Sequence, residues 1–176
     1  ALSPGQVSTT PTAGTMLKFL RPTVYAQLDP DRLAVRDVRT GRAYAARPVG
    51  AVLTGPARKV VRVGDDALTA SAGRPLEIVN PFKHPRMLIA DLTLGQQVLR
   101  GFLEKLYASS LMPRQPVLVL HPRVDPEGGF TEIEIRALHE LGRGAGASRV
   151  LVWHGRELLQ RELLSLQPGS GGKLLA

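Results

Sequence analysis

The chain has 176 residues, of which 43% are hydrophobic and 22% charged, and this composition is typical of one globular domain with a packed core. It contains no cysteine, which excludes disulfides, zinc–thiolate sites and thiol nucleophiles. No apolar run approaches the ~18 residues of a membrane-spanning helix, and the N-terminus lacks the pattern of a secretion signal. We therefore expect a cytoplasmic protein.

The formal net charge is +8, and the arginines that produce it are spread along the chain. Such a charge is compatible with an acidic partner, whether nucleic acid, anionic lipid or an acidic protein face. However, aromatic residues make up only 5% of the chain, so the stacking platforms of single-strand binders are poorly supplied. A solvated basic surface is the better interpretation, and we do not expect nucleic acid as the partner.

The first third of the chain predicts short strands. Residues 1–15 are uncharged and rich in Ser, Thr, Pro and Gly, which indicates a flexible tail, and a single domain should span residues 16–166. Turn residues separate the apolar segments that follow, so a β-meander of about four strands is expected. Its predicted strands are 23–29, 32–38, 43–53 and 59–63; a short helical segment near 67–72 and a brief edge strand at 78–79 come next.

From Asp91 onward the apolar residues recur at helical spacing, which predicts a helix that Asp91 or Thr93 caps and that runs to about Ala108. Two unbroken apolar runs indicate buried strands. These strands are 117–120 and 150–153, the remaining predicted helices are 131–141 and 157–166, and residues 167–176 are glycine-rich and expected to be flexible. The order predicts an α/β fold of ribonuclease-H-like type, a mixed sheet of about five strands with packed helices.

Several segments follow, in order, the pattern of one protein family. They are Val63–Ala67 (VGDDA), Ile78–Lys83 (IVNPFK), Met87–Asp91 (MLIAD), Val117–Pro122 (VLVLHP), Gly129–Ala137 (GFTEIEIRA) and Gly144–Val150 (GAGASRV). This pattern resembles that of the MreB/Mbl bacterial actins, whose matching segments read VG-x-x-A, I-x-P-(h)-x-x-G-V-I-A-D, VLVCVP, G-A-T-x-V-E-R-R-A and GAGAREV. The resemblance runs from about residue 16 to 166 and implies an actin-like fold limited to the first, IA-like, subdomain.

The resemblance also implies where ATP would bind, because the first hairpin of actin-like proteins reads D-L-G-T-A-N and cradles phosphate. Here the matching stretch is QLDPDR: Gln27 replaces the aspartate, Asp29 replaces a glycine, and Pro30 removes an amide donor. We therefore expect this loop to repel phosphate and the protein to use no cofactor. Asp29 and Asp31 are candidates for recruiting a cation, although an Asp-rich turn is the commoner explanation.

Three further residues are candidate site residues. Glu134 matches a glutamate that positions the attacking water in the family, but Thr131 and Glu134 also form the S/T-x-x-E pattern of a helix capping box. His121 and His154 follow the two buried strands and are candidates for a metal pair or for acid–base partners. No third ligand is evident, and single polar residues commonly end strands, so we predict no metal site.

An N-terminal segment offers a different kind of contact. Leu17, Lys18, Phe19, Leu20 and Arg21 combine apolar and cationic residues, as in the short amphipathic anchors of several MreB relatives. Weak contact at the inner face of the membrane is one interpretation, and a leader that packs on the sheet is the other.

Taken together, these features predict a non-catalytic MreB-like protein that acts by association with a protein partner. A full-length bacterial actin or the cell-shape machinery is the partner that the resemblance implies. Two alternatives remain open: a basic nucleic-acid-binding module of ribonuclease-H-like fold, and a protein with residual ATP binding. A two-metal nuclease of this fold would need clustered carboxylates, which Gln27 on the first strand disfavours.

Overall fold

The computed structural model describes residues 21–70, 75–108 and 115–176. Its strands are β1 (Thr23–Leu28), β2 (Leu33–Asp37), β3 (Ala43–Ala46), β4 (Gly50–Leu53), β5 (Lys59–Val63), β6 (Leu76–Val79), β7 (Val117–Pro122), β8 (Arg149–Gly155) and β9 (Gly172–Leu175). Its helices are α2 (Asp65–Leu68), α3 (Leu92–Leu106), α4 (Glu132–Gly144) and α5 (Gln160–Ser165). Among these described helices none has the length and apolar character needed to cross a membrane.

In the described ranges the strands form two sheets. The larger has six strands in the order β3-β2-β1-β7-β8-β9, and the smaller has three in the order β5-β4-β6. Strands β1, β7 and β8 run parallel, whereas β2, β3 and β9 are antiparallel to their neighbours. The central parts of β7 and β8 are buried on both faces, which explains their unbroken apolar runs.

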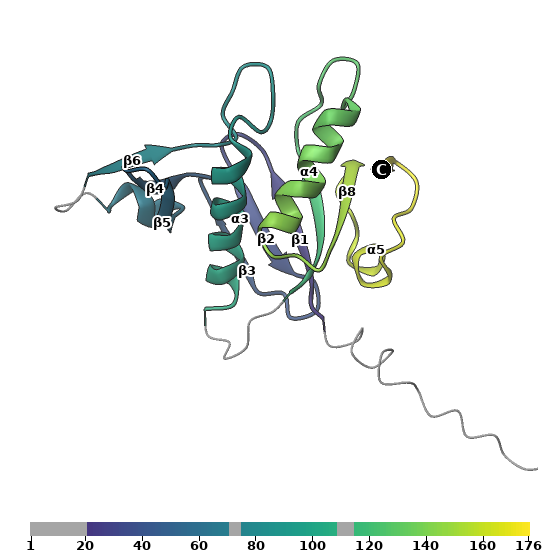
Figure 1. Cartoon of the computed structure of the whole chain (residues 1–176). Coiled ribbons are helices and arrows are strands. Elements are labelled where there is room, and N and C mark those ends of the chain that lie inside the picture. The colour runs from purple at the N-terminus through teal and green to yellow at the C-terminus, as the bar shows by residue number, and fades with distance from the viewer. Residues whose placement is uncertain (1–20, 71–74, 109–114) are drawn as a thin grey trace, which may run out of the picture.

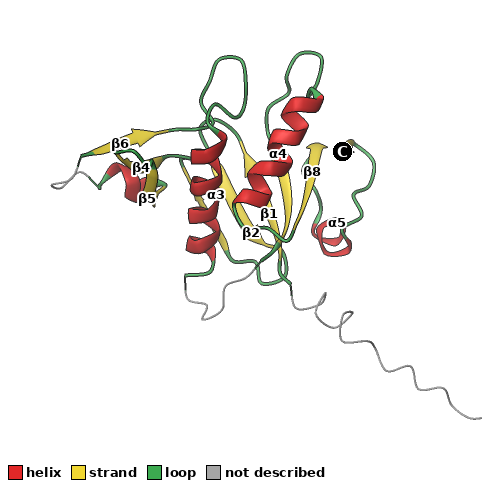
Figure 2. Cartoon of the chain, in the orientation of Figure 1, coloured by secondary structure: helices red, strands yellow, loops and turns green. Residues whose placement is uncertain are grey.

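Helices α3 and α4 lie side by side on one face of the large sheet, and α5 lies against the other (Figures 1 and 2). Alternation along the strands divides the core accordingly. Val24, Ala26 and Leu28 of β1 belong to the cluster beneath α3 and α4, whereas Tyr25 packs with Trp153 and the residues around α5. The small sheet projects beyond α3, which contacts both β5 and the large-sheet strands β2 and β3.

The α/β fold and most helix boundaries agree with the sequence-based predictions. Asp91 is the N-cap of α3, since its side chain accepts the Leu94 amide at 2.9 Å. The large sheet has six strands, one more than the five or so predicted. The predicted four-strand meander is shorter in the structure, since only β1, β2 and β3 continue in one sheet. Residues 43–53 divide into β3 and β4 around Pro48, which has no amide to donate, and β4 joins the second sheet with β5 and β6.

The prediction of a flexible end at 167–176 was wrong over its last residues. Strand β9 pairs antiparallel with β8 at the edge of the large sheet, with Gly172 opposite Gly155. The glycines permit this pairing: a Cβ on Gly172 would lie 2.3 Å from the Trp153 ring, and Gly171 adopts a positive φ of 94°. These glycines allow two backbones to approach closely. A glycine-rich sequence does not reveal whether its glycines serve such an approach or a flexible segment.

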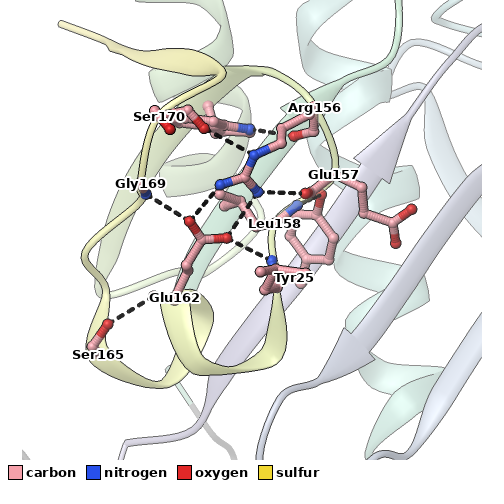
Figure 3. Close-up of polar contacts among 10 residues, drawn as sticks. Tyr25, Arg156, Glu157, Leu158, Glu162, Ser165, Gly169 and Ser170 are labelled. Carbon is pink, nitrogen blue, oxygen red and sulfur yellow. Dashed lines mark hydrogen bonds and ion pairs between the residues drawn. The ribbon is translucent and has the colours of Figure 1, made fainter.

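An ion pair between the exposed Arg156 and the buried Glu162 closes this C-terminal segment onto the sheet (Figure 3). The guanidinium of Arg156 donates to both carboxylate oxygens of Glu162, at 2.9 and 2.6 Å. The amides of Leu159 and Gly169 donate to the same carboxylate at 2.8 and 2.7 Å. The hydrogen bond from Arg156 and that from the Leu159 amide hold the pKa of Glu162 at about 2, below its ordinary 4.5.

We expect Glu162→Gln to loosen the segment from α5 to β9, because the neutral amide loses the ion pair and cannot accept from all four donors. Amide hydrogen exchange should become faster at Leu159 and Gly169 and stay unchanged in β7. Since the folded-state pKa is depressed, the carboxylate stabilises the fold above about pH 4.5 and ceases to do so as the pH falls towards 2. Unchanged exchange at both amides would show that the ion pair does not hold the segment.

Candidate functional site

The carboxyl ends of the parallel strands meet at one edge of the large sheet. Leu28 of β1 lies opposite Pro122 of β7, and the Arg123 amide donates to the Leu28 carbonyl at 2.7 Å. The β1–β2 turn, the loop between β7 and α4 and the end of β8 therefore share this edge, where Figure 1 shows the β7–α4 loop. In open α/β sheets this edge is where ligands bind.

The β1–β2 turn at this edge uses its own carboxylate to satisfy its amides. Asp29 Oδ1 accepts the backbone amides of Asp31 and Arg32, at 2.9 and 2.7 Å. The Asp29 amide itself donates to the Arg32 carbonyl at 3.0 Å, and Pro30 has no amide proton. Converging backbone amides of this kind form a concave site that attracts anions. In this turn the Asp29 carboxylate already accepts the hydrogen bonds that the amides of Asp31 and Arg32 would donate to a bound anion.

A second loop holds the turn from outside. The Asn80 side-chain amide donates to the Pro30 carbonyl at 2.7 Å, and Lys83 forms an ion pair with Asp31 at 3.2 Å. Asn80 also accepts the Phe82 amide at 3.0 Å, so its orientation is fixed by two contacts. The sequence indicated Asp29 and Asp31 as turn residues but gave no local signal for Asn80 and Lys83, which lie some fifty residues further along the chain.

Gln27 lies in β1 beside His121 of β7, on the sheet face that α5 covers. His121 is only 1% exposed; its Nδ1 accepts the Tyr25 hydroxyl at 2.5 Å and its Nε2–H donates to the Gly155 carbonyl at 3.0 Å. Burial, reinforced by the positive charge of Arg123, lowers the pKa of His121 to about 4. The end of β1 and the end of β7 thus place a neutral amide and a neutral imidazole side by side.

The two strand-end histidines do not form a pair. His121 faces α5, whereas His154 packs edge-to-face on Phe130 with ring centroids 5.2 Å apart and lies 3.5 Å from Asp125. Successive residues of a strand point to opposite faces, and His154 is displaced by one position from the residue level with His121. The described residues contain no cluster of three or more His, Asp or Glu side chains placed to hold a metal ion.

The Glu134 side chain is part of the N-terminal capping box of α4. Its Oε2 accepts the Thr131 amide at 2.9 Å and the Thr131 hydroxyl at 2.8 Å, and the same hydroxyl oxygen accepts the Glu134 amide at 3.3 Å. These reciprocal bonds satisfy donors at the helix N-terminus and confirm the capping box seen in the sequence. Of the candidate membrane-contact residues, Arg21 is exposed, and Leu17, Lys18, Phe19 and Leu20 lie outside the described residues.

Comparisons with known proteins bear on these observations. The family model described as MreB/Mbl protein matches residues 40–157. A crystal structure of MreB 5 of Spiroplasma citri bound to AMPPNP has a similar fold, with a TM-score of 0.53 and 18% sequence identity. The similarity covers 75% of this chain and 38% of the Spiroplasma chain, so the two share a part of that protein's structure. None of the curated proteins that were compared matches this chain.

Proposed function

Because this chain belongs to the MreB/Mbl family, we propose that it is a non-catalytic member that neither binds nor hydrolyses ATP and acts by binding a protein partner. The observation that carries this proposal is the β1–β2 turn, whose amides are taken by Asp29 Oδ1. A phosphate group at this turn would find the amides of Asp31 and Arg32 already bonded to Asp29, and its negative charge would lie close to the Asp29 carboxylate. Like charges at such distances repel, most strongly where solvent is partly excluded.

The surrounding residues support the same proposal. Gln27 offers a metal ion one neutral oxygen in place of a carboxylate, and the neighbouring His121 uses both ring nitrogens in hydrogen bonds. A bound Mg²⁺ prefers carboxylate oxygens. Gln27 and His121 have none, and the nearby carboxylates of Asp29 and Asp31 already accept backbone amides and the Lys83 ammonium. The Glu134 carboxylate accepts hydrogen bonds from Thr131 in the helix cap. Each candidate catalytic group therefore has a structural role that accounts for its position.

We expect no change in melting temperature when Mg-ATP is added at millimolar concentration. A ligand present at ~100 times its Kd would stabilise the folded state by about 2.7 kcal/mol, which a thermal melt detects easily. The matched variant is Asp29→Gly, which frees the amides of Asp31 and Arg32; nucleotide stabilisation of this variant alone would identify the carboxylate as the block. Clear stabilisation of the wild-type protein by Mg-ATP would overturn the proposal.

For the partner, we propose a full-length actin of the same family, through which the protein takes part in cell-shape control. The supporting observation is family membership over residues 40–157. Co-sedimentation with polymerised, purified MreB tests it directly. The protein should pellet with the filaments in a saturable manner and stay in the supernatant without them. Failure to pellet at saturating filament concentration would remove this partner while leaving the ATP result untouched.

A further inference from the structure

A groove of about 920 Å³ separates the small sheet from α3, away from the strand ends described above. One wall is β5, and the other is the face of α3 that carries Gln97, Arg100 and Glu104. Close approach of the two elements at one point defines its floor: Gly101 lies so near Val63 that a Cβ would be 2.6 Å from the valine side chain. Figure 1 shows β5 and α3 as the elements that flank this region.

Strand β5 is an edge strand of the small sheet and has β4 as its neighbour on one side. On its other side, the side-chain amide of Gln97 accepts from the Val60 amide at 2.9 Å and donates to the Arg58 carbonyl at 3.2 Å. The N–H and C=O of one residue in an adjacent parallel strand would make the same pair of hydrogen bonds. Gln97 therefore stands in for a missing strand at one position, and this part of the edge is able to pair with an extended chain.

The side chains around the groove carry an excess of positive charge. Lys59, Arg62, Arg100 and Lys105 line it, against Asp66 and Glu104. Lys105 and Asp66 neutralise one another in an ion pair, and this contact lowers the pKa of Asp66 and raises that of Lys105. Within the described ranges, Lys59 and Arg62 form no ion pair and are exposed on β5. An acidic occupant would complement this charge.

We propose that this groove binds an extended, acidic segment of a protein partner, which adds as a strand to the free edge of β5 and takes over the hydrogen bonds of Gln97. Main-chain pairing supplies affinity in this mode, and alternate side chains supply specificity. Acidic side chains of the segment meet Lys59 and Arg62, and apolar ones meet the partly exposed Val60 and Val61. This inference rests on the proposed function, because it gives the associating protein a docking surface of stated chemistry.

A polypeptide fits the groove better than a nucleic acid. The lining residues include several valines and no aromatic ring on which a base could stack. The donor and acceptor that β5 presents to Gln97 match the spacing of a peptide backbone, not that of phosphates.

The experiment measures fluorescence anisotropy of a labelled synthetic peptide that alternates glutamate and valine, titrated with the full chain at low salt. We expect saturable binding that weakens as salt rises, and no binding of the matching lysine–valine peptide. Methylation of the backbone nitrogens on one edge of the acidic peptide should abolish binding, because strand pairing needs those donors. Strand addition would be overturned if binding survived methylation of each edge in turn, and also survived methylation of both edges together.

The variants separate charge at the groove from charge in general. The double variant Lys59→Glu, Arg62→Glu should lose affinity by roughly tenfold or more, since both reversed side chains are exposed and face the peptide. The control, Arg39→Glu with Arg123→Glu, makes the same change in net charge outside the groove lining and should bind as the wild type does. Circular dichroism melts verify that both variants fold.

Two results would overturn the docking proposal: no binding of the acidic peptide at millimolar concentration, or equal loss of binding in the groove and control variants. Tight binding of an oligo-dT strand that only the groove variant abolishes would also overturn it, in favour of nucleic acid. None of these outcomes depends on ATP or on MreB filaments, so failure of the groove and failure of the proposed function are distinguishable.

Discussion

Replacing Phe102 by alanine should destabilise the fold by about 3–5 kcal/mol, the usual cost of removing a large, fully buried side chain together with the cavity it leaves. Phe102 is 0% exposed, and its ring lies 5.0 Å from that of Tyr44, centroid to centroid. It belongs to α3, which contacts β2 and β3 of the large sheet and β5 of the small one. A cavity here weakens the element that joins the two sheets. Urea unfolding followed by circular dichroism measures the loss.

The matched control is Ile133→Ala in α4, where the side chain is 81% exposed. Its effect should remain within about 0.5 kcal/mol, as for most surface substitutions. Because Phe102 supports α3 behind the groove, the alanine variant should also bind the acidic peptide less well. A loss below about 1 kcal/mol would mean that the core collapses around the missing ring and that α3 is a weaker link between the sheets than its burial indicates.

The elements that the sequence predicted well are those whose signal is local. The apolar runs 117–120 and 150–153 are unbroken because β7 and β8 are buried on both faces. The sequence of each strand therefore indicates its burial directly. The caps are local as well. The Thr131–Glu134 pair predicted the cap of α4, and for α3 the sequence left Asp91 and Thr93 as candidates, of which Asp91 is the cap. The Asp-rich turn between β1 and β2 was predicted for the same reason.

The elements that the sequence missed depend on contacts between distant segments. Whether β4 continues the meander or joins another sheet is decided by its pairing with β6 and by the packing of α3 on β5, and neither is encoded locally. Strand β9 is predicted as flexible because Gly171 and Gly172 lack side chains, yet that lack is what lets β9 pass over Trp153. Pattern analysis detects glycine but not what lies against it.

At the candidate site, too, some features have a local signal in the sequence and others depend on distant contacts. Departures from the family hairpin at Gln27, Asp29 and Pro30 are visible in the sequence, and they predicted a poor phosphate loop. The structure adds an observation in support of that prediction: the Asp29 carboxylate accepts the backbone amides of Asp31 and Arg32. For His121 the sequence offered a metal or acid–base role beside the commoner polar strand end, and it gave no sign of burial. Its burial follows from a tyrosine and a glycine carbonyl that lie far from it along the chain.

The buried imidazole of His121 makes a second large effect predictable: stability should fall as the pH is lowered from about 6.5 towards 4. The unfolded chain binds a proton at this residue near pH 6.5, whereas the folded protein does so only near its lowered pKa of about 4. Between these values the unfolded state binds more protons, so acid favours unfolding. The full shift corresponds to at most about 3 kcal/mol, at 1.36 kcal/mol per pKa unit.

Urea unfolding at about pH 7 and at about pH 4, with and without His121→Gln, tests this prediction. Glutamine can accept from Tyr25 and donate to the Gly155 carbonyl but does not titrate, so the variant should lose most of the pH dependence in this window. His84→Gln, a change on an exposed side chain, should leave the dependence as in the wild type. A wild-type protein equally stable at both pH values, or a slope that persists in His121→Gln, would show that the imidazole is not held neutral by its burial between β1 and β8.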